Sequence, residues 1–103
     1  AGALTPTEIF TAWQAGASMV KVFPCSAMGG ASYIKSLLGP FDHIPLVAVG
    51  GVSIATVSQY FEAGARAVGV SSSLFGKDAL TEKNIKKLTK NVKNYIDSCL
   101  EFI

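Results

Sequence analysis

The sequence has little of what metal centres and disulfide frameworks require. Of its 103 residues, two are cysteine and one is histidine. Cys25, Cys99 and His43 do not follow a zinc-ligand spacing. They support neither a zinc site nor a histidine-based triad, so we predict no metal and no cofactor. The two cysteines are expected to be free thiols in a reducing compartment.

Long apolar runs and strong charge are also missing. No apolar run approaches the ~18 residues of a membrane span, and the N-terminus lacks the pattern of a signal peptide. Charged residues make up 16% of the chain, with a net charge of +2 and no basic stripe, which leaves no electrostatic case for nucleic acid. We therefore expect a cytoplasmic protein without membrane or nucleic-acid partners. Half of the residues are apolar, enough to form a core.

Helical and strand patterns alternate along the chain. The first helix has a clear start, with Thr5 as N-cap, Pro6 in the first turn and Glu8 completing a capping box. Ser53 is expected to be the N-cap of a later helix. Apolar spacing and Gly/Pro stops predict the elements in this order: helix 5–15, strand 19–23, helix 33–38, strand 45–49, helix 53–63, strand 67–70 and a helix from about 81 to the end.

The last predicted helix is amphipathic. Its apolar residues at helical spacing are Ile85, Leu88, Val92, Tyr95, Ile96 and Cys99. Its lysines are Lys83, Lys86, Lys87, Lys90 and Lys93. The lysines could form a binding patch, but a solvated helix face is the simpler interpretation.

The chain repeats itself. Residues 3–23 align without a gap onto residues 51–71, which places the segment 13–17 on 61–65 and Thr5 on Ser53. The unit is a strand followed by a helix, and the repeat spans two units. In this register Ala1-Gly2 match Val49-Gly50 at the end of a strand, so we expect that strand to be missing.

This alternation predicts an α/β fold with a parallel sheet and helices outside it. Three strands alone would have two open edges and one poorly covered face. We therefore interpret residues 1–103 as a single partial domain, about three parallel strands and four helices of a (β/α)8 barrel. Either a missing N-terminal half or oligomerisation would complete it.

Lys21 is the main candidate for chemistry. It lies inside the apolar run 19–23, which reads as a buried strand that Pro24 ends. Burial disfavours the charged form of a lysine, and a neutral amine can attack a carbonyl carbon to form a Schiff base. Phe23 and Pro24 would exclude water and shape a pocket for a small keto acid. The alternatives are a lysine that reaches solvent or pairs with a carboxylate, and a Phe23 that only packs in the core.

Two further loops predict a phosphate site. Gly50-Gly51 and the turn containing Ser72 and Ser73 each follow a predicted strand. Glycine lets backbone N–H groups approach an anion, and serine adds a hydroxyl donor. In parallel α/β folds such loops meet at the carboxyl ends of the strands, and barrel phosphate sites recur in the last two units. Gly50-Gly51 could also be only a turn.

These motifs together resemble the 2-keto-3-deoxy-6-phosphogluconate (KDPG) aldolases, including forms that also cleave 4-hydroxy-2-oxoglutarate (KHG). The resemblance covers about residues 1–76. The matching segments are 5–9, 15–17, 20–24, 29–30, 33–35, 38–41, 44–47, 50–52 and 63–70.

The resemblance implies the C-terminal part of a class I aldolase. Such an enzyme splits KDPG of the Entner–Doudoroff pathway into pyruvate and glyceraldehyde 3-phosphate, through an imine on Lys21 and without a metal. It also implies phosphate contacts from Gly50, Gly51, Ser72 and Ser73, and a cytoplasmic homotrimer. The family's glutamate acid/base lies on an early strand outside this chain, so activity of the chain alone is expected to be weak or absent.

The chain departs from the family pattern near the site. Ala48-Val49 replace the usual Pro-Thr, whose threonine hydroxyl reaches the substrate, so Val49 would contact the substrate without that bond. Cys25 and Ser71 replace smaller residues. Two other functions stay open: a phosphate-binding barrel isomerase or synthase in which Lys21 is structural, and a non-catalytic part-barrel that serves assembly.

Overall fold

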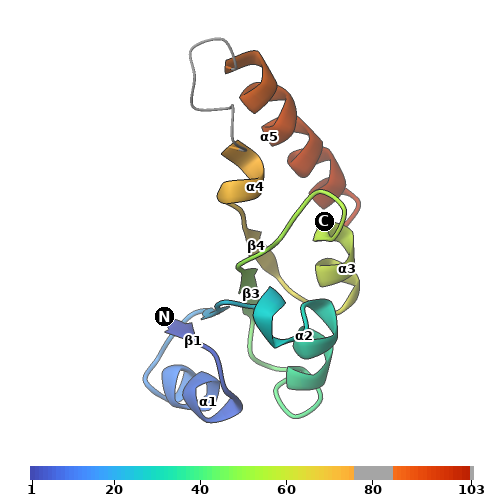
Figure 1. The fold of residues 1–103 in the computed structure, drawn as a ribbon. Coiled ribbons are helices and arrows are strands. Elements are labelled where there is room, and N and C mark those ends of the chain that lie inside the picture. The colour runs from blue at the N-terminus through green and yellow to red at the C-terminus, as the bar shows by residue number, and fades with distance from the viewer. Residues whose placement is uncertain (76–84, 103) are drawn as a thin grey trace.

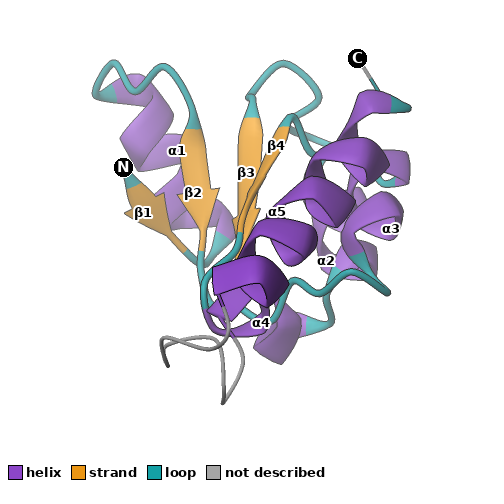
Figure 2. Cartoon of the chain, turned by 90° about the horizontal axis from the view of Figure 1, so that it is seen from above, coloured by secondary structure: helices purple, strands orange, loops and turns teal. Residues whose placement is uncertain are grey.

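The computed structural model describes residues 1–75 and 85–102, and its strands form one parallel sheet in the order β1-β2-β3-β4 (Figures 1 and 2). The elements are β1 (Gly2–Ala3), α1 (Pro6–Gln14), β2 (Val20–Val22), the 3-10 helix η1 (Ser26–Met28), α2 (Ala31–Leu37), β3 (Leu46–Val49), α3 (Val57–Glu62), β4 (Ala67–Gly69), α4 (Ser72–Phe75) and α5 (Ile85–Leu100). The α/β class and the parallel sheet are confirmed. No helix within these ranges is long and apolar enough to cross a bilayer.

The sheet has four strands, one more than the approximate number of three that the sequence predicts. Gly2 and Ala3 form a short strand that pairs in parallel with Lys21 and Val22. The end of the strand that the repeat register had marked as missing is therefore present. Two residues carry no periodicity of their own, so only pairing to β2 identifies them as a strand.

The internal repeat is visible in the way α1 and α3 end. Gly16 and Gly64 both have a left-handed φ, 98° and 109°. The N–H of Ala17 donates to Ala12 O at 3.2 Å, and the N–H of Ala65 donates to Tyr60 O at 3.0 Å. These are matching C-terminal caps, in which glycine adopts the left-handed conformation at no steric cost.

The two helices start differently. Thr5 caps α1 through a complete capping box with Glu8, as predicted. Ser53 does not cap α3: Thr56 is the N-cap, and the Ser53 N–H donates to Thr56 Oγ1 at 3.0 Å. The local turn between these two residues replaces the first helical turn, so the N-cap of α3 lies three residues later than the pattern predicts.

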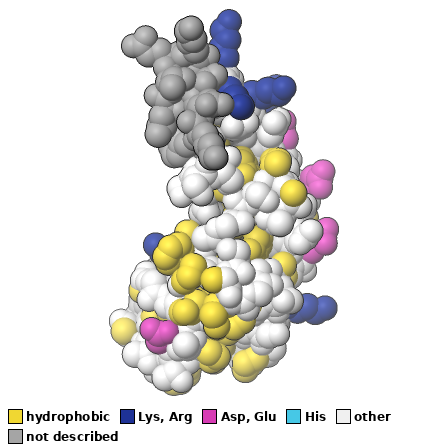
Figure 3. Space-filling view, in the orientation of Figure 1, with side chains coloured by type: hydrophobic (Ala, Val, Ile, Leu, Met, Phe, Trp, Pro, Cys, Tyr) yellow, Lys and Arg dark blue, Asp and Glu magenta, His cyan; other side chains and the backbone are white. Residues whose placement is uncertain are grey.

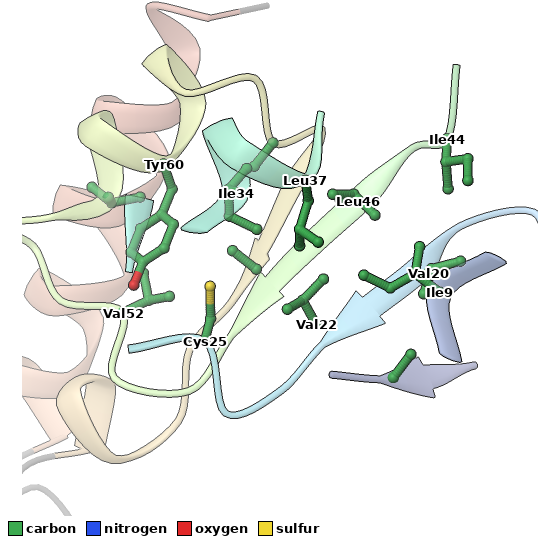
Figure 4. Packing of buried hydrophobic residues seen from close by; sticks show 14 of the residues in the cluster. Ile9, Val20, Val22, Cys25, Ile34, Leu37, Ile44, Leu46, Val52 and Tyr60 are labelled. Carbon is green, nitrogen blue, oxygen red and sulfur yellow. The ribbon is translucent and has the colours of Figure 1, made fainter. Parts of the chain in front are cut away.

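The helices of the described residues cover one face of the sheet. Val20, Val22, Leu46 and Ala48 point toward them and are buried. Figure 4 shows Ile34, Leu37 and Tyr60 packing from the helices onto that face. Lys21, Val47 and Ala67 are aligned across the strands on the other face. Figure 3 shows hydrophobic side chains gathered at the surface near the N-terminal strands and α2.

The last helix is less buried than its pattern predicts. Tyr95 is 7% exposed and joins the core, and Cys99 packs against it. Ile85 and Ile96 remain 66% and 53% exposed, so only part of the apolar stripe is covered. The predicted first turn of this helix, residues 81–84 with Lys83, lies outside the described residues.

Candidate active site

Lys21 lies on the uncovered face of the sheet. Strand β2 alternates, with Val20 and Val22 buried and Lys21 exposed. The prediction that Lys21 is buried is wrong, because this residue lies on the face of the sheet that none of the described helices covers. Its Nζ lies 5.5 Å from the centre of the Phe23 ring, within range of a cation–π contact. Phe23 itself is 52% exposed, so it is not a core residue.

The loop after β2 is bound to the loop after β3. Cys25 N–H donates to Val49 O at 2.8 Å, and Ser26 N–H donates to Gly50 O at 3.2 Å. A Cβ added to Gly50 would lie 2.9 Å from Pro24 Cα, closer than real Cβ contacts allow. Lys21, Phe23 and the glycine pair therefore share one end of the sheet.

Gly51 fits closely against the same loop. Its φ is +73°, and a Cβ there would lie 2.1 Å from Ser26 Oγ. Glycine is required on both counts, backbone conformation and space. Among the described residues, no acceptor pairs with the N–H groups of Gly50 and Gly51, so both remain available to an anion.

The serine turn lies against this glycine loop. Ser73 Oγ donates to Val52 O at 2.6 Å and accepts from the Tyr95 hydroxyl at 2.8 Å. The Ser73 hydroxyl is thus occupied within the protein, and we expect its contribution to an anion to come from the backbone N–H. Ser72, the first residue of α4, is exposed.

Val49 completes the open face at the end of β3. It pairs with Gly69, and a Cβ on Gly69 would lie 2.8 Å from Val49 Cγ2. The valine therefore leans over β4 on the face that carries Lys21. It offers an apolar surface where a threonine would offer a hydroxyl.

Glu8, Glu62 and Cys25 are poor candidates for a general base. Glu8 is bound to Thr5 in the capping box, which lowers its pKa, and Glu62 lies on α3. Burial raises the pKa of Cys25, which keeps its thiol protonated. Cys25 and Cys99 are both free, as predicted. Within residues 1–75 and 85–102, no group of His, Cys, Asp and Glu could hold a metal ion.

Ser26 and Tyr95 were not among the predicted site residues. Ser26 follows Cys25 in a small-residue loop, and nothing in the sequence marks its contact with Gly51. Tyr95 was assigned to the apolar stripe of the last helix. A tyrosine in such a stripe is a weak signal, because its hydroxyl needs a partner when the ring is buried.

Parallel strands with helices outside, and loops that meet at their carboxyl ends, are typical of part of a (β/α)8 barrel. A family model described as "KDPG and KHG aldolase" matches residues 1–91. The chain belongs to the KDPG and KHG aldolase family.

Individual relatives agree with this assignment. The chain is 40% identical over 96 residues to a 2-dehydro-3-deoxy-6-phosphogalactonate aldolase of Escherichia coli, covering 91% of this chain and 46% of that protein. It is 34% identical over 83 residues to a 2-dehydro-3-deoxy-phosphogluconate aldolase of Haemophilus influenzae, covering 81% and 39%. The chain spans about half the length, or less, of these relatives.

Solved structures show the same fold. A structure described as native KDPGal superposes with a TM-score of 0.76 at 36% identity, over 96% of this chain and 48% of that one. A cube-shaped protein cage designed by fusing symmetric oligomeric domains superposes with a TM-score of 0.78 at 36% identity, over 97% and 37%.

Proposed function

We propose that this chain carries the imine-forming lysine and the phosphate-binding loops of a class I aldolase. The substrate would be a phosphorylated 2-keto-3-deoxy sugar acid, cleaved to pyruvate and glyceraldehyde 3-phosphate. The observation that carries the proposal is the position of Lys21, on the open face and at the same end of the sheet as Gly50 and Gly51. Family membership supports it independently.

Lys21 would act as nucleophile and electron sink. Its amine attacks the C2 carbonyl, and loss of water gives a protonated imine. Cleavage of the C3–C4 bond sends the bonding pair toward the iminium nitrogen, forming an enamine, while the C4 hydroxyl loses its proton and becomes the aldehyde. Protonation of the enamine at C3 and hydrolysis then release pyruvate and the free amine. Phe23 and Pro24 would border the substrate.

The substrate phosphate would bind to backbone N–H groups. Those of Gly50 and Gly51 are available, the Ser73 hydroxyl reaches the same loop at Val52, and Ser72 precedes Ser73 at the start of α4. Backbone donors of this kind suit a dianion, because several N–H dipoles can converge on its oxygens. Val49 would contact the sugar chain. Val49 has no hydroxyl to select one epimer of the sugar acid, and one relative is named as a phosphogalactonate aldolase. The galactonate epimer is therefore the first substrate to test beside KDPG.

The proton on the C4 hydroxyl requires a base that we do not find among the described residues near Lys21. From the family resemblance we expect a glutamate outside the chain to serve this step, and Glu8 and Glu62 are on helices. We therefore propose that the chain alone forms the imine but cleaves substrate weakly or not at all. By the same resemblance, the complete enzyme would be a cytoplasmic homotrimer.

Borohydride trapping tests the lysine directly. The chain is incubated with pyruvate, reduced with sodium borohydride, digested and analysed by mass spectrometry. We expect the adduct on Lys21 and its loss in Lys21→Ala, while Lys35→Ala, a matched exposed lysine on α2, retains it. Absence of label at Lys21, with a phosphosugar still bound by Lys21→Ala, would instead favour an isomerase or synthase.

A further inference from the structure

Three elements meet at a two-bond hydrogen-bond chain. The Tyr95 hydroxyl, from α5, donates to Ser73 Oγ at 2.8 Å, and Ser73 Oγ, from α4, donates to Val52 O at 2.6 Å. A serine hydroxyl has one proton, so donation to Val52 leaves it as the acceptor for Tyr95. The direction of both bonds is therefore fixed.

The end of this chain is the loop that contains Gly50 and Gly51. Val52 is 2% exposed, and its carbonyl belongs to the same peptide as the Ser53 N–H, which donates to Thr56 Oγ1 at 3.0 Å. Both ends of that peptide are thus held. On the other side, Ser26 N–H donates to Gly50 O. The glycine pair is fixed between these anchors.

The ring of Tyr95 is anchored in the core, 7% exposed. One helical turn earlier, Asn91 Nδ2 donates to Leu74 O at 3.0 Å. Helix α5 therefore holds α4 at two successive residues, Ser73 and Leu74. Through Ser73, helix α5 is thus connected to the loop that follows β3.

We propose that Tyr95 is a positioning residue for the phosphate-binding loop. Through Ser73, its hydroxyl fixes the Val52 peptide and with it the direction of the Gly50 and Gly51 N–H groups. The inference rests on the proposed function, because it assigns Tyr95 to the phosphate end of that site. It predicts that loss of the hydroxyl affects phosphate binding and leaves imine formation at Lys21 unchanged.

Tyr95→Phe keeps the ring and removes the hydroxyl. With the full chain and inorganic phosphate as probe, we expect the phosphate Kd to rise about two- to tenfold, the effect of one hydrogen bond. The rate of pyruvate trapping at Lys21 should not change. Cys99→Ala, which removes packing from the same helix without touching the hydrogen-bond chain, should leave the phosphate Kd unchanged.

Ser73→Ala removes both hydrogen bonds of the chain at an exposed position. It therefore tests the proposal even if Tyr95→Phe does not fold. Because both variants break one chain, the double variant should bind phosphate no more weakly than Ser73→Ala alone. Unchanged phosphate affinity in Tyr95→Phe, additive losses, or an equal loss in Cys99→Ala would overturn the proposal. If the wild-type chain traps pyruvate but does not bind phosphate, the role proposed for Tyr95 and the proposed phosphate site are both wrong. The proposed role of Lys21 would then still hold.

Discussion

The Glu8 carboxylate links the stability of α1 to pH. It accepts hydrogen bonds from the Thr5 N–H at 3.0 Å, the Thr5 hydroxyl at 2.9 Å and the Leu4 N–H at 3.3 Å. These bonds, the Thr5 backbone bond first, lower its pKa from the ordinary 4.5. A carboxyl with a lowered folded-state pKa contributes stability that is complete above the unfolded value and is lost as pH falls through the folded value.

Glu8→Gln is therefore expected to lower Tm at pH 7, and the difference from wild type should close as the pH falls below 4.5. Glutamine can still accept in a capping box, so the variant removes the charge and keeps the shape. Thermal unfolding followed by circular dichroism from pH 7 to pH 3 measures this. Glu62→Gln removes the same charge from α3 and is the control. A Tm difference that is independent of pH would contradict the prediction.

Lys21 shows how far a single residue could be predicted. The sequence identified it as the reactive lysine candidate because it interrupts an apolar run. It did not reveal the side to which the lysine points, because a run of three to five residues fits both a buried strand and an alternating one. Pairing with β1 and β3 settles the orientation. Two other contacts could not be predicted from the sequence either, because they join residues far apart along the chain. They are the contact of Gly51 with Ser26 and that of Ser73 with Val52.

At the scale of elements, the repeat allows a matched comparison of two glycines. Gly16 ends α1 in open space, whereas a Cβ on Gly64, which ends α3, would lie 2.6 Å from Leu38 Cδ1. Gly16→Ala should cost about 1–2 kcal/mol for the left-handed backbone alone. Gly64→Ala should cost about 0.5–1.5 kcal/mol more, because Leu38 must leave its preferred rotamer.

Urea unfolding of the two single variants measures this difference. In a Leu38→Ala background the clash disappears, and the two glycine substitutions should then cost the same. A gap that persists without the leucine side chain would show that the backbone at Gly64, and not Leu38, is responsible.

Elements with strong local signals were predicted well. The start of α1 follows from the capping box, and its end from Gly16. The start of α3 was missed because neither hydroxyl caps the helix. Thr56 is the N-cap, but its Oγ1 accepts from the Ser53 N–H and not from an N–H group of α3. Strand β1 and helix α4 are shorter than any periodic pattern, so only the surrounding structure defines them.

At the scale of the whole molecule, the chain is more extended than a compact domain. Its radius of gyration is 14.5 Å, against about 13 Å for a compact chain of 100 residues, and its extents are 46 × 24 × 23 Å. From the small number of strands, the sequence predicts two open sheet edges and a poorly covered face. Within residues 1–75 and 85–102, one face of the sheet and part of the apolar stripe of α5 are uncovered, and no strand pairs with the outer edges of β1 and β4.

Uncovered strand edges and apolar surface favour association of chains. We expect the sedimentation coefficient to rise with protein concentration. Ile96→Lys, which places a charge in the exposed stripe of α5, and Val47→Lys, which places one on the open face of the sheet, should each weaken association without loss of helical circular dichroism. Gln59→Lys adds the same charge to an exposed position on α3 and should leave association unchanged. A stable monomer at all concentrations would contradict the prediction. It would show that the exposed strand edges and apolar side chains do not drive association.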